Sequence, residues 1–149
     1  MTVNVRRAEP ADRAACLALL ATLIDEAVQP GWETTYEVLL AGRRGDILLA
    51  VEDGRLLGVV TVSYNLAIRY AGEYCQIEEL IVDPAARGKN IGALLVTAAV
   101  EVARERGCAE IGLYLVAHTE RNRPFYEKYG FRFTGSEMRQ SLVAAGEPR

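Results

Sequence analysis

The sequence predicts an α/β (α+β) fold, a single domain with a mixed sheet and helices on both of its faces. Three observations favour this class. Apolar runs of strand length alternate with segments of helical periodicity, two such runs flank an Asp-Gly pair, and another ends in a Gly-containing turn that opens a helix. The 149 residues are enough for one domain with a real core and too few for two, so we expect one domain over residues 1–149.

Two helices are predicted near the N-terminus, after a first strand over Val3–Arg6. The first helix covers residues 10–28, because Pro10 suits an initial helical turn and apolar side chains recur on one face. That face comprises Cys16, Leu19, Leu20, Leu23, Ile24 and Ala27. Pro30-Gly31 ends this helix, and a shorter one follows over Glu33–Ala41, closed by Gly42.

The rest of the chain predicts strands alternating with helices. Residues 46–52 and 55–65 flank Asp53-Gly54, a strong hairpin signal. The later expected elements are a strand over Tyr74–Val82, a helix over Gly92–Arg106, a strand over Ala109–Val116, a short helix within residues 121–131 and a closing strand over Phe131–Leu142. We expect residues 144–149 to form a frayed tail.

The segment IEELIVDPAARGKNIG, residues 77–92, is typical of an anion-binding turn. A strand that ends where a helix begins leaves backbone N–H groups unpaired, with the positive end of the helix dipole behind them and Arg87 and Lys89 alongside. A P-loop would need Ser or Thr after Lys89, where Asn90 stands, and a Rossmann turn would need a different glycine spacing. The turn therefore predicts an anionic ligand, with a pyrophosphate favoured.

The turn resembles the (Arg or Gln)-x-x-Gly-x-(Gly or Ala) loop of the GNAT superfamily of acetyl-coenzyme A N-acetyltransferases. Arg87, Asn90 and Gly92 match its first, fourth and sixth positions, with Asn90 in place of the usual Gly. Asn tolerates the left-handed conformation better than other residues that carry a side chain, so we expect the turn to survive. The resemblance is nearest to acetyltransferases of small amines such as aminoalkylphosphonates and polyamines.

A second motif, RNRPFYEKYGF over residues 121–131, resembles the short helix that follows the next strand in the same superfamily. Its Phe125-Tyr126 pair stands near the helix start, and Gly130 and Phe131 close it. The interval between the two motifs leaves room for one helix and one strand, as the family's order requires. Together the motifs extend the specific resemblance over roughly residues 74–134.

The resemblance implies a mostly antiparallel sheet in which the strands at Tyr74–Val82 and Ala109–Val116 run parallel and splay apart. It also implies acetyl-coenzyme A as the cofactor, with its pantetheine arm in that gap and its pyrophosphate on the turn. The implied cofactor-binding residues are Leu80, Ile81, Val82, Arg87, Gly88, Lys89, Asn90, Ile91, Gly92, Ala93 and Asn122. Asn122 fits a helix N-cap equally well.

The implied reaction transfers an acetyl group from acetyl-coenzyme A to the primary amine of a small molecule, by direct attack in a ternary complex. It needs a base for the ammonium, a donor to the carbonyl oxygen and an acid for the leaving thiolate. Tyr126 matches the family's acid, with a pocket wall as the alternative role. The resemblance implies that the backbone N–H of Leu80 donates a hydrogen bond to the carbonyl oxygen of the thioester.

Alternation along the strand separates its carboxylates. Gln76, Glu78 and Leu80 are expected on one face, and Ile77, Glu79 and Ile81 on the other. Family members with an acidic residue or histidines on this strand have them at the positions of Gln76 and Glu78. Glu78 is therefore the leading base, acting directly or through a water, and Glu79 is the second choice because it could instead anchor a helix or loop. A structural carboxylate is the alternative for both.

The acceptor pocket has no motif of its own. Trp32, Tyr36 and Arg69 are substrate-binding candidates, together with Glu79 and the tyrosines Tyr64, Tyr70 and Tyr74. Together they suggest a small amine whose anionic group meets Arg69. Acetylation of a protein amino terminus, a lysine or an aminoglycoside stays open, as does a non-catalytic acyl-coenzyme A sensing module. The resemblance also admits a homodimer formed through the final strand.

Composition excludes several other classes. The chain is 50% hydrophobic and 25% charged with a net charge of −3, so we expect a globular protein with no nucleic-acid partner. Its start lacks an apolar signal region and no stretch reaches the length of a membrane span, which predicts a cytoplasmic location. The scattered Cys16, Cys75 and Cys108 are expected to be buried reduced thiols, and the single His118 argues against a metal site.

Overall fold

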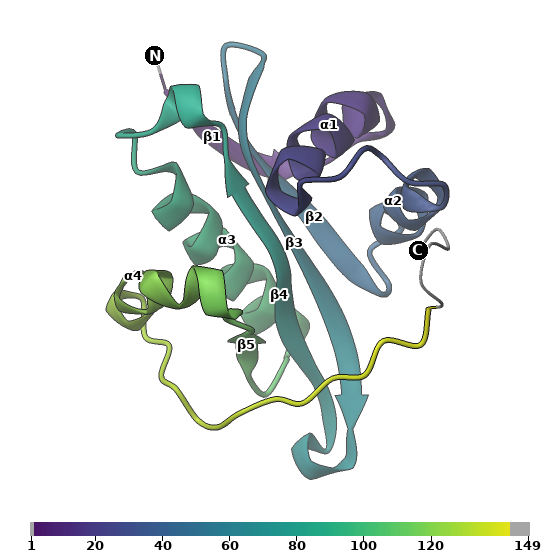
Figure 1. Cartoon of the computed structure of the whole chain (residues 1–149), viewed down its shortest axis with the longest axis vertical. Helices are drawn as coiled ribbons and strands as arrows, with labels where there is room; N and C mark the ends of the chain where they lie inside the picture. Colours follow the sequence, from purple (N-terminus) through teal and green to yellow (C-terminus); the bar gives the residue numbers. More distant parts are fainter. Residues whose placement is uncertain (1, 144–149) are drawn as a thin grey trace.

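The computed structural model describes residues 2–143 and shows a sheet between two helical layers (Figure 1). The five strands are β1 (Asn4–Arg7), β2 (Gly45–Glu52), β3 (Arg55–Ala67), β4 (Gly72–Val82) and β5 (Ile111–Leu113), and they lie side by side in chain order. The pairings from β1 to β4 are antiparallel, whereas β4 and β5 are parallel. The predicted α/β class with a mixed sheet is confirmed.

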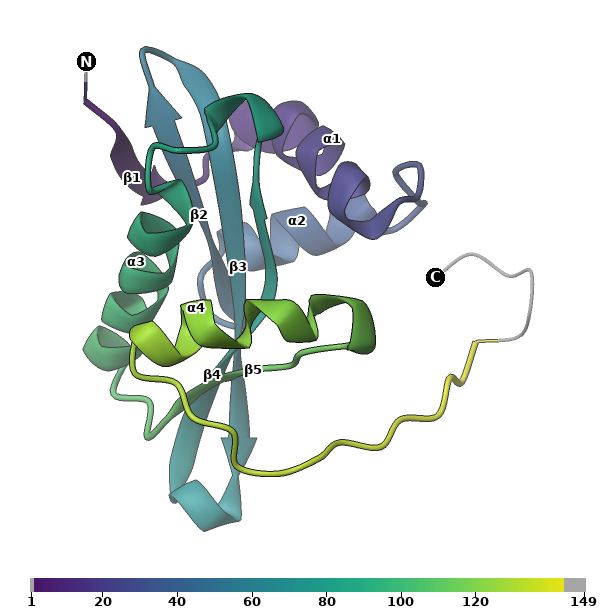
Figure 2. The same cartoon turned by 60° about the vertical axis from the view of Figure 1, so that its left-hand side comes forward.

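Helices cover both faces of this sheet. The α-helices are α1 (Arg13–Ile24), α2 (Trp32–Leu40), α3 (Ile91–Arg106) and α4 (Arg123–Lys128). Short 3-10 helices are η1 (Pro10–Asp12), η2 (Ile68–Tyr70), η3 (Pro84–Ala86) and η4 (Ala117–Asn122). Helix α3 lies on one face and α1 and α2 lie on the other, which the view turned by 60° also shows (Figure 2). Among residues 2–143, the structure has no helix with the length and apolarity of a membrane span.

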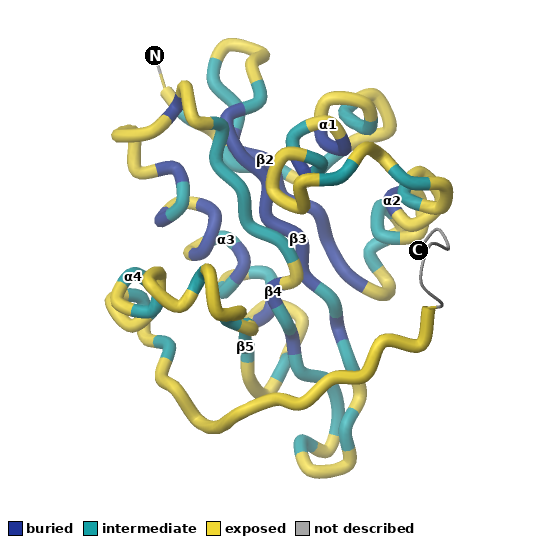
Figure 3. The backbone as a smooth tube through the Cα atoms, viewed as in Figure 1, coloured by how far each residue is buried: buried dark blue, intermediate teal, exposed yellow. Residues whose placement is uncertain are grey.

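Two apolar cores follow from the alternation of side chains along β2 and β3. Val60 and Val62 of β3 face α3 and pack with its Leu95. The intervening Val59 faces the opposite way and packs with Leu20 of α1. The deepest burial runs along the middle of β2 and β3 (Figure 3). These strands are buried on both faces, which explains why they read as nearly continuous apolar runs.

The predicted hairpin at Asp53-Gly54 is confirmed. Both residues have positive φ, 51° and 75°, and they connect Glu52 directly to its partner Arg55. Two consecutive positive φ angles define a type I′ turn, whose twist matches that of the flanking strands. Asp-Gly is a favoured sequence for this turn because both residues accept the left-handed conformation.

The first helix is shorter than predicted. Pro10 opens η1, and α1 ends at Ile24 because Asp25 adopts a left-handed conformation with φ 58° and its N–H bonds the carbonyl of Ala21. Ala27 therefore lies outside the helix, and Leu23 and Ile24 are 38% and 39% exposed. The second helix was predicted to within one residue at each end.

The closing strand predicted over Phe131–Leu142 is wrong. Residues 131–143 have no strand assignment, and Phe133 and Met138 are 63% and 97% exposed. A strand needs a partner edge, and β5 offers only three residues instead of the eight predicted over Ala109–Val116. The N–H of Phe131 bonds the carbonyl of Tyr126, so the start of the segment is held to α4 instead of pairing with a strand. The predicted tail, residues 144–149, lies outside the described residues.

The cysteines are unpaired thiols, and two of them are in the core. Cys16 and Cys75 are fully buried, and burial raises the pKa of each to about 12. Both thiols are therefore protonated and unreactive at neutral pH. Cys108 is half-buried. The predicted burial is thus confirmed for Cys16 and Cys75 and is only partial for Cys108.

Candidate active site

The turn between β4 and α3 has the backbone of an anion-binding loop. Gly88 and Asn90 are left-handed, with φ 87° and 63°, and Asn90 is the N-cap residue of α3. Asp83 stabilises the start of the turn by accepting a 3.0 Å hydrogen bond from the N–H of Ala85. Asn90 thus adopts the conformation for which Gly is usual at this position, as the sequence predicts.

Six consecutive amides are free at this turn. Within residues 2–143, the N–H groups of residues 88–93 make no hydrogen bond to backbone or side chain, whereas the next amide, of Leu94, bonds the carbonyl of Asn90. Free amides at a helix start, with the positive end of the helix dipole behind them, form a site for phosphate groups. The residues present therefore fit a pyrophosphate.

The two cations beside the turn differ in their surroundings. Lys89 pairs with Glu52 through a 2.8 Å contact between Nζ and Oε1, so part of its charge is already neutralised. Arg87 is exposed and makes no ion pair within the described part of the chain. Arg87 is therefore the better placed of the two to meet an anionic ligand.

Helix α4 packs on the first turn of α3 through Gly92. A Cβ added to Gly92 would lie 3.4 Å from Cζ of Phe125 and 4.0 Å from Cγ2 of Val82. The absent side chain therefore makes room for an aromatic ring. This contact brings the second motif against the anion-binding turn.

Strands β4 and β5 part at the middle of β4. Their pairing consists of Cys75–Ile111, Gln76–Gly112 and Ile77–Leu113, and then it stops. Residues 79–82 of β4 remain paired with β3 alone. The edge that they turn toward β5 is open to a ligand that supplies hydrogen bonds. The family resemblance implied that these two strands are parallel and part.

A β-bulge occurs where the pairing with β5 ends. Thr61 of β3 is opposite Glu79, but the next residue, Val62, is opposite Ile77, so Glu78 is an extra residue in β4. The bulge reverses the alternation of side chains. Before it, Ile77 packs in the core beside α3, and after it Leu80 packs on the same core instead of the opposite one.

Glu78 and Glu79 consequently lie on the same face of the sheet. The hydroxyl of Ser63 donates a 2.6 Å hydrogen bond to Oε2 of Glu78, and the hydroxyl of Thr61 donates to Oε1 of Glu79. Thr61 and Ser63 are two residues apart in β3 and share the face covered by α1 and α2. The predicted separation of the two carboxylates onto opposite faces is wrong, because simple alternation does not hold across a bulge.

The two carboxylates have different environments. Glu78 is exposed, whereas Glu79 is partly buried. Burial raises the pKa of Glu79, the bond from Thr61 lowers it, and the charge of Glu78 raises it further. Glu79 is thus more easily protonated than an ordinary glutamate, while Glu78 remains open to solvent and to a cationic ligand.

Tyr126 belongs to an aromatic cluster at the start of α4. Its ring centroid is 5.1 Å from that of Phe125 and 6.0 Å from that of Phe131. Burial raises the pKa of Tyr126, so its phenol is neutral at neutral pH and can donate a proton. Its hydroxyl makes no hydrogen bond to any residue in the described range 2–143, so it is free to act on a ligand.

Three of the predicted acceptor-site residues pack against other side chains of the protein. Tyr36 is 2% exposed and its hydroxyl donates a 2.6 Å hydrogen bond to the carbonyl of Glu9, so it belongs to the core. Trp32 packs against the same core. Arg69 lies in η2 over the rings of Tyr70 and Tyr74, and the whole of β4 separates it from the turn. Arg69 is therefore remote from the carboxylate pair, whereas Trp32 and Tyr36 belong to α2, which covers the face of the sheet that carries the pair.

The other candidates are also accounted for. Tyr64 is buried and its hydroxyl donates a 2.5 Å hydrogen bond to Oδ2 of Asp46, whose Oδ1 lies 3.0 Å from Nε of Arg7. Asn122 is the N-cap residue of α4, but its side chain makes no capping hydrogen bond. The proposed contact of Asn122 with pantetheine therefore stays a prediction. His118 is exposed and lies in η4.

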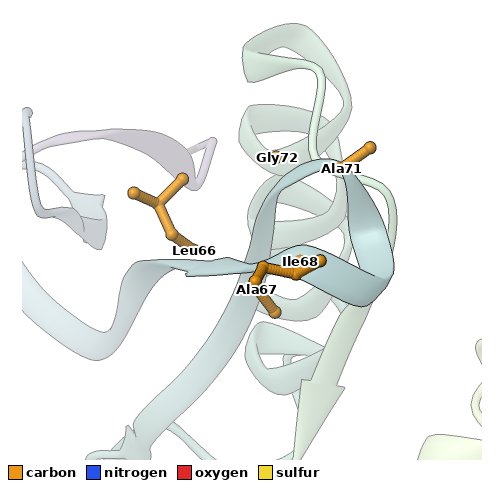
Figure 4. A pocket seen from close by; sticks show the side chains of 5 residues that line it. All are labelled: Leu66, Ala67, Ile68, Ala71 and Gly72. Atoms are coloured by element: carbon orange, nitrogen blue, oxygen red, sulfur yellow. The ribbon is translucent and has the colours of Figure 1, made fainter.

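A shallow hollow lies at the far end of the β3–β4 hairpin, away from these groups (Figure 4). It is lined by Leu66, Ala67, Ile68, Ala71 and Gly72. None of these side chains carries a titratable or nucleophilic group, so the hollow offers no acid–base chemistry. The described residues also contain no cluster of His, Cys, Asp and Glu suited to a metal ion.

Three polar residues of β3 were not singled out from the sequence. Thr61 and Ser63 hold the two carboxylates, and Nδ2 of Asn65 donates a 3.0 Å hydrogen bond to Oγ of Ser63. They alternate with Val62 and Tyr64 in an otherwise apolar run. Polar residues at every second position of a buried strand were the available signal.

The comparisons agree with the fold. The model of the Acetyltransferase (GNAT) family matches residues 16–131. The chain therefore belongs to the GNAT acetyltransferase family and is an N-acetyltransferase. Enzymes of this family use acetyl-coenzyme A as the acetyl donor.

Relatives of known activity act on different small amines. A glucosamine 6-phosphate N-acetyltransferase of Trypanosoma brucei brucei is 29% identical over 145 residues, which cover 94% of this chain and 96% of the relative. An aminoalkylphosphonate N-acetyltransferase of Salmonella typhimurium is 28% identical over 143 residues, covering 88% and 89%. The crystal structure of a Trypanosoma brucei acetyltransferase, 27% identical, superposes with a TM-score of 0.80 over 95% of this chain and 100% of that one.

Proposed function

We propose that this protein transfers the acetyl group of acetyl-coenzyme A to the primary amine of a small molecule, by direct attack in a ternary complex. The observation that carries this proposal is the bulge at Glu78. It places two carboxylates on one face of β4, at the point where β4 parts from β5. A proton acceptor thus stands beside an opening in the sheet.

Acetyl-coenzyme A supplies the acetyl group as a thioester. The free amides of residues 88–93, with Arg87, bind its pyrophosphate. The open edge of β4 at residues 80–82 binds its pantetheine arm as a strand would be bound. Asn122, at the start of α4, contacts the same arm.

The N–H of Leu80 donates to the thioester carbonyl oxygen. Strand geometry supports this assignment, because the N–H of Glu79 points to β3, where it bonds Oγ1 of Thr61 at 3.1 Å. Successive amides of a strand point to opposite edges, so the N–H of Leu80 points to the open side. A fixed donor at this position stabilises the negative charge that develops on the oxygen.

Glu78 is the base. Its exposed carboxylate attracts the cationic ammonium of the acceptor and takes a proton from it, directly or through a water, so that the neutral nitrogen can attack the carbonyl carbon. Glu79, with its raised pKa, is the second candidate on the same face. The two acids together favour a cationic acceptor over an anionic one.

Tyr126 is the acid. When the new C–N bond has formed and the C–S bond breaks, the phenol gives its proton to the departing sulfur. The raised pKa of Tyr126 keeps this proton in place until it is needed. The new amide nitrogen loses its excess proton to solvent, and solvent restores the proton to the phenolate.

The acceptor class is tested with a panel of amines and a thiol reporter that detects released coenzyme A. Because relatives act on glucosamine 6-phosphate and aminoalkylphosphonates, the panel pairs each phosphorylated or phosphonylated amine with its neutral counterpart and adds polyamines and a lysine peptide. Turnover of a small amine well above that of the peptide supports the proposal. Turnover of the peptide alone assigns the protein acceptor instead, and no turnover despite cofactor binding indicates a sensing module.

We also propose that the protein forms a homodimer in the cytoplasm. The segment 131–143 is extended and unpaired, with Phe133, Met138 and Leu142 63%, 97% and 90% exposed, and β5 has no partner on its outer edge within residues 2–143. An extended segment with exposed apolar side chains can pair with the open strand edge of a second copy.

A proline in the segment tests the dimer. Met138→Pro removes an N–H needed for strand pairing but no contact of the monomer, and Met138→Ala is the control. Sedimentation should show a dimer for wild type and Met138→Ala, and a monomer for Met138→Pro. A wild-type monomer at micromolar concentration would contradict the dimer.

A further inference from the structure

Thr61 is an unusual residue in the core of this sheet. Only Asp46 and Thr61 are polar or charged among the buried residues of the described chain, and Thr61 is 2% exposed. The burial of Asp46 is explained by its ion pair with Arg7 and its bond from Tyr64. A buried hydroxyl is costly unless it is hydrogen-bonded, so the partners of Thr61 indicate what it does.

Both hydrogen bonds of Thr61 go to one residue. Its Oγ1 accepts from the N–H of Glu79 at 3.1 Å and donates to Oε1 of the same glutamate. In a regular antiparallel pair, a strand N–H of this kind would bond a backbone carbonyl. The hydroxyl of Thr61 gives this N–H a side-chain acceptor at the bulge, where the register of the ladder shifts.

The same two bonds fix three features of the site. They hold the backbone of Glu79, they orient its carboxylate, and they keep the adjacent Glu78 as the unpaired residue of the bulge. We infer that Thr61 is a positioning residue for the acetyl-transfer reaction. Its hydroxyl clamps the bulge so that both carboxylates face the acceptor side and the N–H of Leu80 faces the open edge of β4.

This inference rests on the proposed function for its effect on catalysis, but the clamp itself can be measured without catalysis. Thr61→Val removes the hydroxyl and keeps the branched shape of the side chain, whereas Thr61→Ser keeps the hydroxyl. Thr22→Val is a matched control, because the hydroxyl of Thr22 bonds the carbonyl of Leu19 on the outside of α1.

The kinetic readout is the pH profile of kcat/KM with the best amine. Thr61→Val should lower kcat/KM at neutral pH at least about tenfold, since a small displacement of reacting groups is enough for such a loss. The kcat/KM of Thr61→Ser should stay close to that of wild type. The kcat/KM of Thr22→Val should equal that of wild type.

The structural readout is hydrogen exchange at the amide of Glu79, measured by NMR. Exchange should be slow in wild type and Thr61→Ser and fast in Thr61→Val. If wild type acetylates no amine, the proposed function fails while this readout still decides the clamp. If Thr61→Val does not fold, fast exchange of the Glu79 amide in wild type, or in Thr61→Ser, overturns the inference.

Two further results would also overturn it. One is a Thr61→Val enzyme with the wild-type pH profile and an equally protected Glu79 amide. The other is a Thr61→Ser enzyme as impaired as Thr61→Val, because the shape of the side chain would then matter instead of its hydroxyl.

Discussion

Gly92 and Phe125 lie in direct contact across the start of α3, where a Cβ on Gly92 would stand 3.4 Å from Cζ of the phenylalanine ring. This contact joins the anion-binding turn to the helix that carries Tyr126. The missing side chain of Gly92 faces the ring, so a larger residue would act first on α4. The position thus couples cofactor binding to the placement of the acid.

A substitution series at Gly92 tests this coupling. Gly92→Ala places its methyl at an ordinary contact distance and should be tolerated. Gly92→Val should push Phe125 away and lower the free energy of unfolding by about 1–3 kcal/mol, the usual effect of overpacking. Urea unfolding measures the difference. Equal stability of the two variants would show that α4 yields freely at this contact.

Asn90 tests the anion-binding turn. Asn90→Val forces a β-branched residue into a left-handed conformation with φ 63°, whereas Asn90→Gly accepts it without strain. Calorimetry should show acetyl-coenzyme A binding at least about tenfold weaker in Asn90→Val, worth about 1.4 kcal/mol, and unchanged in Asn90→Gly. Equal affinities in two folded variants would remove the turn from the cofactor site.

Tyr126→Phe should separate catalysis from stability. The hydroxyl of Tyr126 has no partner among residues 2–143, so its removal should leave the fold and cofactor affinity intact. Turnover should fall by about 10²-fold, the scale of losing a positioned general acid. The control is Tyr129→Phe, because the ring of Tyr129 packs at an angle on Phe125, with centroids 5.2 Å apart, and Tyr129 has no catalytic role. If both variants keep the wild-type kcat when the chemical step limits the rate, Tyr126 is a wall of the pocket and not the acid.

Glu78→Gln should lose activity in a pH-dependent way. A neutral amide cannot accept the ammonium proton, but an amine that is already deprotonated in solution no longer needs a base. The deficit in kcat/KM should therefore shrink as pH rises toward the pKa of the amine. The exposed Glu33 of α2 provides the control substitution Glu33→Gln. A loss that is the same at every pH would indicate a role in structure or substrate binding, and Glu79 would become the base.

Glu79 should make the stability of the fold depend on pH. Its pKa in the folded protein is raised above the ordinary value of 4.5, mainly by burial. The neutral form therefore adds stability below about pH 4.5, and this contribution is lost as pH rises through the raised value. Relative to Glu79→Gln, wild type should lose stability across that interval in urea unfolding. A constant difference between the two proteins would mean that Glu79 titrates normally.

The sequence was sufficient for most of the fold because local signals and tertiary packing agree. Asp53-Gly54 determines its own turn, and the apolar periodicity of residues 92–106 predicts α3, in which Leu95 and Ala99 are buried. The closing strand over Phe131–Leu142 failed because strand formation depends on a partner edge, which local sequence does not contain. The first helix was extended too far because its end depends on one left-handed residue, Asp25.

Part of the candidate site could also be predicted from the sequence, and part of it could not. The left-handed Asn90 and the partly buried Tyr126 follow from motifs that are continuous in sequence. The arrangement of Glu78 and Glu79 depends on a bulge, and the bulge depends on a hydroxyl of another strand, that of Thr61. Alternation within β4 alone cannot reveal an extra residue in the pairing.

The most direct test of the account is a single-turnover experiment on the complex with acetyl-coenzyme A, mixed with the best small amine of the panel and quenched over time. Coenzyme A and the N-acetylated amine should appear together, at the same rate, with no acetyl group on the protein. Glu78→Gln and Tyr126→Phe should slow both products equally. Acetyl-coenzyme A that remains intact in the complex with every amine would contradict the central claim that this site transfers acetyl groups.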